Sequence, residues 1–133
     1  MYEKFGQFID GKWSHSTDKS TYEVINPANE EIIGHASKAT TQDVDRALKS
    51  AERGLEVWKK TPPWQRSYII RRIADKIREK QDILAKWMTL EVGKPLAEAK
   101  GEVNGAADIF EWNAEETKRI YGQTVESRFQ DTR

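Results

Sequence analysis

The sequence contains no cysteine and only two histidines among its 133 residues. Without a thiol, the chain cannot form a disulfide, supply a thiolate nucleophile or bind a metal through sulfur. His15 and His35 have no second histidine at a ligand spacing, so we interpret both as structural or surface residues. The sequence therefore predicts neither a catalytic nor a metal-binding constellation of these residue types.

Long apolar runs and an excess of one charge are also missing. No segment approaches the roughly 18 to 20 apolar residues of a membrane span, and the first residues lack the pattern of a signal peptide. We therefore predict a cytoplasmic protein with no membrane partner. Lys and Arg number 22, as do Asp and Glu, and this neutral balance argues against nucleic acid as a partner. Apolar residues make up only 37%, which is low for a domain that buries its own core.

Turn signals divide the first 39 residues into two predicted β-hairpins. Asp10-Gly11 separates two short apolar runs, and this dipeptide tolerates the positive φ of a two-residue turn. In the second hairpin, Pro27 to Glu30 separates strands predicted at 22–26 and 31–37, because Pro blocks a helix and Asn favours a turn.

Beyond residue 39 the apolar residues recur at intervals of three and four, which is typical of amphipathic helices. A first helix is predicted from Thr40, where Asp43 completes a capping box, to the residues before Pro62-Pro63. The second helix starts at these prolines, breaks or bends around residues 80–82 and ends at Gly93.

The third predicted helix spans residues 95–121 and is closed by Gly122. Several residues on its predicted inner face are small or polar, which favours close packing against a neighbour. This face comprises Leu96, Ala99, Val103, Ala106, Phe110, Asn113, Thr117 and Tyr121. The chain itself is thus expected to be mainly α, with two small hairpins and about three long helices.

Two of these segments carry opposite charges. The basic residues between positions 59 and 80 are Lys59, Lys60, Arg66, Arg71, Arg72, Lys76, Arg78 and Lys80. The acidic residues of the third helix are Glu98, Glu102, Asp108, Glu111, Glu115 and Glu116. A phosphate-binding surface and paired catalytic acids are two interpretations. Mutual attraction within the fold or across an oligomer is the simpler one.

Other motifs are incomplete. Gly93-Lys94 lacks both the earlier glycine and the following Ser or Thr of a phosphate loop. Trp58 and Trp87 lie on apolar helical faces, so we predict that they pack in the core. Residue chemistry alone identifies no catalytic constellation.

Taken together, several segments resemble the aldehyde dehydrogenase superfamily. They are F-I-D-G-K-W near the amino terminus, V-I-N-P-A-N-E-E-I-I-G-H-A at 24–36 and T-Q-D-V-D-R-A-L-K-S-A at 41–51. The later segments T-L-E-V-G-K-P-L-A-E-A at 89–99 and G-E-V, E-W, A-E-E and K-R-I-Y-G within 101–122 are most similar to the succinate-semialdehyde dehydrogenase branch. The resemblance covers nearly the whole chain in the correct order.

The resemblance implies an α/β parent enzyme with a Rossmann-like cofactor domain, which oxidises an aldehyde to a carboxylate with NAD or NADP. In that family a cysteine thiolate attacks the aldehyde, an Asn holds the oxyanion and a Glu activates water. Since this chain has no cysteine, the resemblance implies an amino-terminal fragment of the cofactor domain. Its expected parts are hairpins in 1–39, helices in 40–122 and the start of a truncated strand segment in 123–133.

The family's site residues transfer to almost no position here, so we assign no catalytic and no cofactor-binding residue. Glu111-Trp112-Asn113 lacks the proline of the family's Pro-Trp-Asn motif and lies in mid-helix. Some family members bind a monovalent cation through a backbone carbonyl before the N-P turn and an acid before G-K-P. These positions correspond to Ile25 and Glu91.

For this chain alone we expect no dehydrogenase activity and no strong binding of NAD or NADP. Its expected partners are the remainder of the parent polypeptide and further copies of itself, through exposed helical faces. The alternative is an autonomous α-helical protein-interaction module, which would have a self-sufficient core. Reading the coding sequence past Arg133 distinguishes the two.

Overall fold

The structure is a computed structural model that describes residues 6–122 and 128. The strands are β1 (Gln7–Ile9), β2 (Lys12–Ser14), β3 (Thr21–Ile25) and β4 (Ile32–Ser37), and they form two separate antiparallel pairs. The helices of the described region are α1 (Thr41–Trp58), α2 (Pro63–Glu79), α3 (Gln81–Val92) and α4 (Leu96–Glu116), followed by the 3₁₀ turn η2 (Thr117–Arg119). The predicted mainly helical fold with two small hairpins is confirmed, with four helices in place of three.

Both hairpins form where the turn signals predict them. Asp10 and Gly11 have φ values of 55° and 74°, so both residues of the β1–β2 turn lie in the left-handed region. Across this pair Phe8 lies opposite Trp13, and their rings are 5.1 Å apart. In the second pair Tyr22 lies opposite Ala36, and the register shifts near the end of β3.

The predicted second helix is in fact two helices. Lys80 has φ −103° and ψ 15°, outside the helical region, so α2 ends and α3 begins at this residue. The break lies where the sequence predicts a break or bend. Gly93 ends α3 with φ 75°, as expected of a left-handed C-terminal glycine.

The predicted third helix ends earlier than the sequence indicates. Regular α-helix stops at Glu116, and Thr117 to Arg119 tighten into a 3₁₀ turn. The Thr117 hydroxyl donates a hydrogen bond to the carbonyl of Asn113 at 2.8 Å, and the Thr117 backbone N–H donates to the same carbonyl. Except for Arg128, the strand segment predicted at 123–133 lies outside the described residues.

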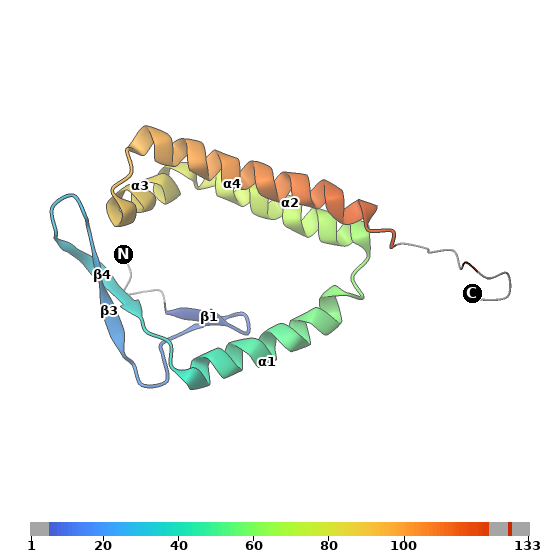
Figure 1. The fold of residues 1–133 in the computed structure, drawn as a ribbon, viewed down its shortest axis with the longest axis horizontal. Coiled ribbons are helices and arrows are strands. Elements are labelled where there is room, and N and C mark those ends of the chain that lie inside the picture. Colours follow the sequence, from blue (N-terminus) through green and yellow to red (C-terminus); the bar gives the residue numbers. More distant parts are fainter. Residues whose placement is uncertain (1–5, 123–127, 129–133) are drawn as a thin grey trace.

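The core is narrow and lies in the helical part of the molecule. Its buried apolar residues are Ala74, Ala85, Ala99, Val103, Ala107 and Ala114. Because these side chains are small, α2 and α4 run side by side at short range, as Figure 1 shows. The predicted close packing is confirmed, but the buried face is displaced: Ala106, Phe110 and Asn113 are exposed, whereas Ala107 and Ala114 are buried.

Helix α1 lies apart from the α2–α4 pair, beside the hairpins (Figure 1). Its apolar side chains are open to solvent: Leu48 and Leu55 are each 59% exposed and Val44 is 49% exposed. Trp58 is also exposed, so its predicted core position is wrong, whereas Trp87 is half-buried. The described residues therefore do not form the self-sufficient core that the interaction-module alternative requires.

Candidate functional site

The opposed charges of α2 and α4 neutralise each other within the fold. Arg71 pairs with Glu111 at 2.6 Å and also with Glu115, while Arg78 pairs with Asp108 at 2.8 Å and with Glu111 at 2.7 Å. The pKa of the Glu115 carboxyl is lowered, first by a hydrogen bond from Lys118 and then by one from Arg71. The predicted attraction is thus confirmed as intramolecular, and these acids are not arranged as a catalytic pair.

The two histidines lie in separate places. His15 follows β2, and His35 lies opposite Glu23 in the β3–β4 pair. Within residues 6–122 and 128 there is no group of three His, Asp or Glu side chains that could hold a metal ion. No helix of the same region is long and apolar enough to cross a membrane.

The incomplete motifs have structural roles. Gly93 closes α3, and Lys94 forms an ion pair with Glu102. The Asn113 side-chain amide donates to the Ile109 carbonyl of its own helix at 2.8 Å. Neither segment is therefore arranged to bind phosphate or an oxyanion.

Ile25 and Glu91, the two positions predicted as cation ligands, belong to segments that the fold brings together. Ile25 ends β3, just before the turn that contains Pro27, and Glu91 lies in the last turn of α3, just before Gly93. A Cβ atom built on Gly93 would lie 3.0 Å from Cγ of Pro27. The turn that contains Pro27 therefore contacts the end of α3, although the two residues are 66 positions apart in the sequence.

Asp43 organises the junction between the strands and α1, and it is 1% exposed. Its carboxylate accepts hydrogen bonds from the Thr40 backbone N–H at 2.9 Å and from the Thr40 hydroxyl at 2.9 Å. It also accepts from the Thr17 hydroxyl at 2.7 Å and the Thr17 backbone N–H at 3.1 Å, and Arg46 donates to it at 2.7 Å. These hydrogen bonds, first the one from the Thr40 N–H, hold the pKa of Asp43 far below its usual range.

The sequence predicts only the local part of this cluster. The Thr40–Asp43 capping box is confirmed, with both reciprocal hydrogen bonds formed. Thr17 is 26 residues away in a polar loop, and no pattern in one sequence connects that loop to the start of a helix.

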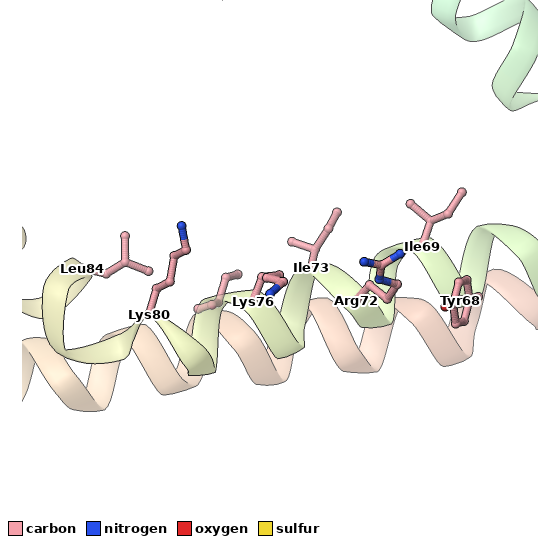
Figure 2. A pocket seen from close by; sticks show the side chains of 8 residues that line it. Tyr68, Ile69, Arg72, Ile73, Lys76, Lys80 and Leu84 are labelled. Carbon is pink, nitrogen blue, oxygen red and sulfur yellow. The ribbon is translucent and has the colours of Figure 1, made fainter. Parts of the chain in front are cut away.

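An apolar groove of about 510 Å³ runs along the face of α2 that points away from α4 (Figure 2). Ile69, Ile73 and Leu84 line it, and Ile69 and Ile73 are 39% and 40% exposed. Arg72, Lys76 and Lys80 form a basic row beside these side chains. We call this surface the α2 groove.

Comparison with known proteins agrees with these observations. A profile described as the aldehyde dehydrogenase family matches residues 13–133. The glutarate-semialdehyde dehydrogenase of Pseudomonas putida is 44% identical over 126 residues, which are 95% of this chain and 26% of that protein. The NADP⁺ succinate-semialdehyde dehydrogenase of Escherichia coli is 42% identical over 125 residues, which are 94% of this chain and 26% of that protein.

Solved structures show the same relation. The betaine aldehyde dehydrogenase of Staphylococcus aureus in complex with NAD⁺ matches with a TM-score of 0.89 and 34% identity, over 95% of this chain and 25% of that chain. This chain therefore spans about a quarter of the length of the relatives it matches. From the matched residues and the shared fold, the chain belongs to the aldehyde dehydrogenase family.

Proposed function

We propose that this chain is the amino-terminal portion of an NAD(P)-dependent aldehyde dehydrogenase whose substrate is a semialdehyde of a short dicarboxylic acid. The names of the relatives from P. putida and E. coli support this substrate class. The match to a quarter of their length supports a portion rather than a whole enzyme. In this proposal residues 1–133 belong to the cofactor domain, and the remainder of the parent polypeptide is the main partner.

The absence of cysteine is the observation on which the proposed inactivity of the chain alone depends. Oxidation of an aldehyde by this family requires a thiolate that attacks the carbonyl carbon, and no residue here supplies one. Gly93-Lys94, which resembles part of a phosphate loop, gives no support for a dinucleotide site, because Gly93 ends a helix and Lys94 is paired with Glu102. NAD or NADP is therefore assigned to the parent enzyme, with its binding residues outside this chain.

The exposed helical faces support the proposed dependence on the remainder. Leu48 and Leu55 of α1 and Ile69 and Ile73 of the α2 groove face solvent. Burying apolar surface contributes about 25 cal/mol per Å², so these faces are stabilised when further protein covers them. We also propose a cytoplasmic location for the parent protein, which stays a prediction.

A chimera tests this function. We expect the purified chain to show no turnover of succinate or glutarate semialdehyde with NAD or NADP. Replacing the matching quarter of the P. putida glutarate-semialdehyde dehydrogenase by this chain should give an active enzyme, because the fold of the replaced part is retained. The unmodified P. putida enzyme is the control for the assay. Turnover by the isolated chain, or an insoluble or inactive chimera, would contradict the proposal.

We further propose that the Ile25 carbonyl and the Glu91 carboxylate contribute to a monovalent cation site. The approach of Pro27 to Gly93 supports this, because it places the two segments beside each other. Oxygen ligands suit hard cations, and the remaining ligands would come from the parent polypeptide.

In the active chimera, Glu91→Gln should reduce any dependence of the rate on potassium chloride, relative to an equal concentration of tetramethylammonium chloride. Glu98→Gln, at an exposed position of α4, is the matched control. An unchanged potassium response in the Glu91→Gln chimera would remove Glu91 from the site.

A further inference from the structure

A second pocket, of about 340 Å³, lies between the β1–β2 hairpin and α1. Four of the residues that line it are basic: Lys12 from the hairpin and Arg46, Lys49 and Arg53 from α1. Among the described residues that line the pocket, Asp10 is the single acidic one. The pocket thus combines concave shape with an excess of positive charge from two separate elements.

A hydrogen-bonded contact holds the two walls of the pocket together. The Asp10 carboxylate, at the tip of the hairpin, accepts a hydrogen bond from the Ser50 hydroxyl at 3.1 Å and one from the Arg53 guanidinium at 3.0 Å. Because Asp10 belongs to the tight β1–β2 turn, this contact fixes the position of Lys12 relative to α1.

The positive charges of the pocket are only partly compensated. Arg53 pairs with Asp10, and Arg46 pairs with the buried Asp43 at 2.7 Å. Within residues 6–122 and 128, Lys12 and Lys49 form no ion pair within 4.0 Å, although Lys12 also attracts the Asp10 carboxylate at longer range. Four basic side chains therefore face two carboxylates, and both ammonium groups keep their donors available.

Lys49 also lies near two other basic side chains of its own helix. It is three residues after Arg46 and four residues before Arg53, and like charges at both spacings repel each other. Asp45 and Glu52, four residues before and three residues after Lys49, offset part of this repulsion without forming an ion pair with it. A bound anion would relieve the remaining repulsion and accept hydrogen bonds from the ammonium groups.

We propose that this pocket binds a small polyvalent oxyanion of the phosphate type, held by Lys12 and Lys49 with the Arg46 guanidinium and the Ser14 hydroxyl beside it. Two unpaired cations favour a ligand with at least two negative charges over a monocarboxylate. The volume accommodates more than one phosphate group, which favours a short polyphosphate. The pocket is separate from Ile25 and Glu91 and does not depend on the proposed dehydrogenase activity.

Titration of the chain with inorganic pyrophosphate tests this site, by calorimetry and by amide NMR shifts at about 0.15 M salt. We expect saturable binding, with shifts concentrated in the β1–β2 turn and residues 46–53 of α1. The Lys12→Gln, Lys49→Gln double variant should bind at least about tenfold more weakly, which is about 1.4 kcal/mol. Lys49→Arg, which retains the charge, should keep most of the affinity.

Lys60→Gln, Lys86→Gln is the matched control, since both lysines are exposed and removed from the pocket. If the control binds pyrophosphate as weakly as the double variant, the loss of affinity is a general effect of removing basic charge, and the proposed site is wrong. Shifts centred on α2, or no saturable binding, would overturn it as well. A far-UV circular dichroism spectrum that is unchanged in the double variant confirms that loss of binding is not loss of fold.

Discussion

Asp43→Asn is expected to lower the thermal midpoint of the chain by about 10 °C. The carboxylate is buried and accepts hydrogen bonds from Thr40, Thr17 and Arg46. An Asn side chain has one acceptor oxygen in place of two and adds two donors, which would face the donors of Thr17 and Thr40. The junction between α1 and the strands should therefore open.

Amide hydrogen exchange measures this effect at the junction. The backbone N–H groups of Thr17 and Thr40 donate to Asp43, so both should lose protection in Asp43→Asn, whereas amides of α4 should keep theirs. Asp75→Asn is the control, because Asp75 is exposed on α2 and does not line the α2 groove. Equal destabilisation by the two substitutions would contradict the proposed role of Asp43.

The same contacts give a pH dependence of known sign. The pKa of Asp43 is lowered in the folded state, first by the hydrogen bond from the Thr40 N–H, relative to an unfolded value of about 3.9. The ionised group therefore stabilises the fold above that value, and its contribution is lost as the pH falls further towards the folded pKa. Asp43→Asn should lack this part of the acid-induced loss of stability.

The isolated chain is expected to self-associate, with α1 of one copy in the α2 groove of a second copy. The apolar residues of α1, among them Leu48 and Leu55, are exposed beside an acidic row. This row consists of Asp45, Glu52 and Glu56, of which Glu56 also pairs with Lys59, and their spacing places them on one side of the helix. The α2 groove has a basic row formed by Arg72, Lys76 and Lys80 beside its exposed isoleucines. Helix α1 of each copy thus complements the α2 groove of the other copy in both apolar character and charge. A symmetric dimer requires such a pair of equivalent contacts.

Charge reversal on one helix at a time tests this dimer by sedimentation. One variant is Asp45→Lys, Glu52→Lys, Glu56→Lys. The other is Arg72→Glu, Lys76→Glu, Lys80→Glu. Each alone should dissociate at least about tenfold more readily than the parent chain, since the two facing rows would then carry charge of the same sign. An equimolar mixture of the two should associate again, because an acidic surface then meets a basic one.

A second arrangement, in which α1 closes onto α2 of its own chain, has a different outcome. With this intramolecular arrangement, the mixture of the two variants would stay monomeric. Only a chain that combines all six charge reversals would regain the compact form. That result, or a parent chain that is monomeric at every concentration, would contradict the dimer. The variant Glu23→Lys, Glu30→Lys, Glu98→Lys changes the charge by the same amount at exposed positions outside both surfaces and is the control.

The sequence predicts local structure well because its signals are local. Asp10-Gly11, the Thr40–Asp43 capping box, the prolines at 62 and 63 and Gly93 mark element ends, and the structure confirms each. The end of α4 at Glu116 could not be predicted in this way, because the helical pattern continues in the sequence to Tyr121.

Contacts between distant segments could not be predicted from one sequence. The partnership of Thr17 with Asp43 and the approach of Pro27 to Gly93 depend on how the elements are arranged in space. Apolar periodicity identified the faces of α1 and α2, but it does not distinguish a face covered by the same chain from one that is left open. For this reason the sequence predicts a core position for Trp58, which is exposed in the structure.

The meeting of Pro27 with Gly93 restricts how this region can evolve. Any larger residue at position 93 would need a left-handed backbone and would also push Pro27 aside. Exposed lysines elsewhere can be exchanged with little effect on the fold. Position 93, which contributes no side chain, is therefore expected to tolerate substitution less well than those exposed positions.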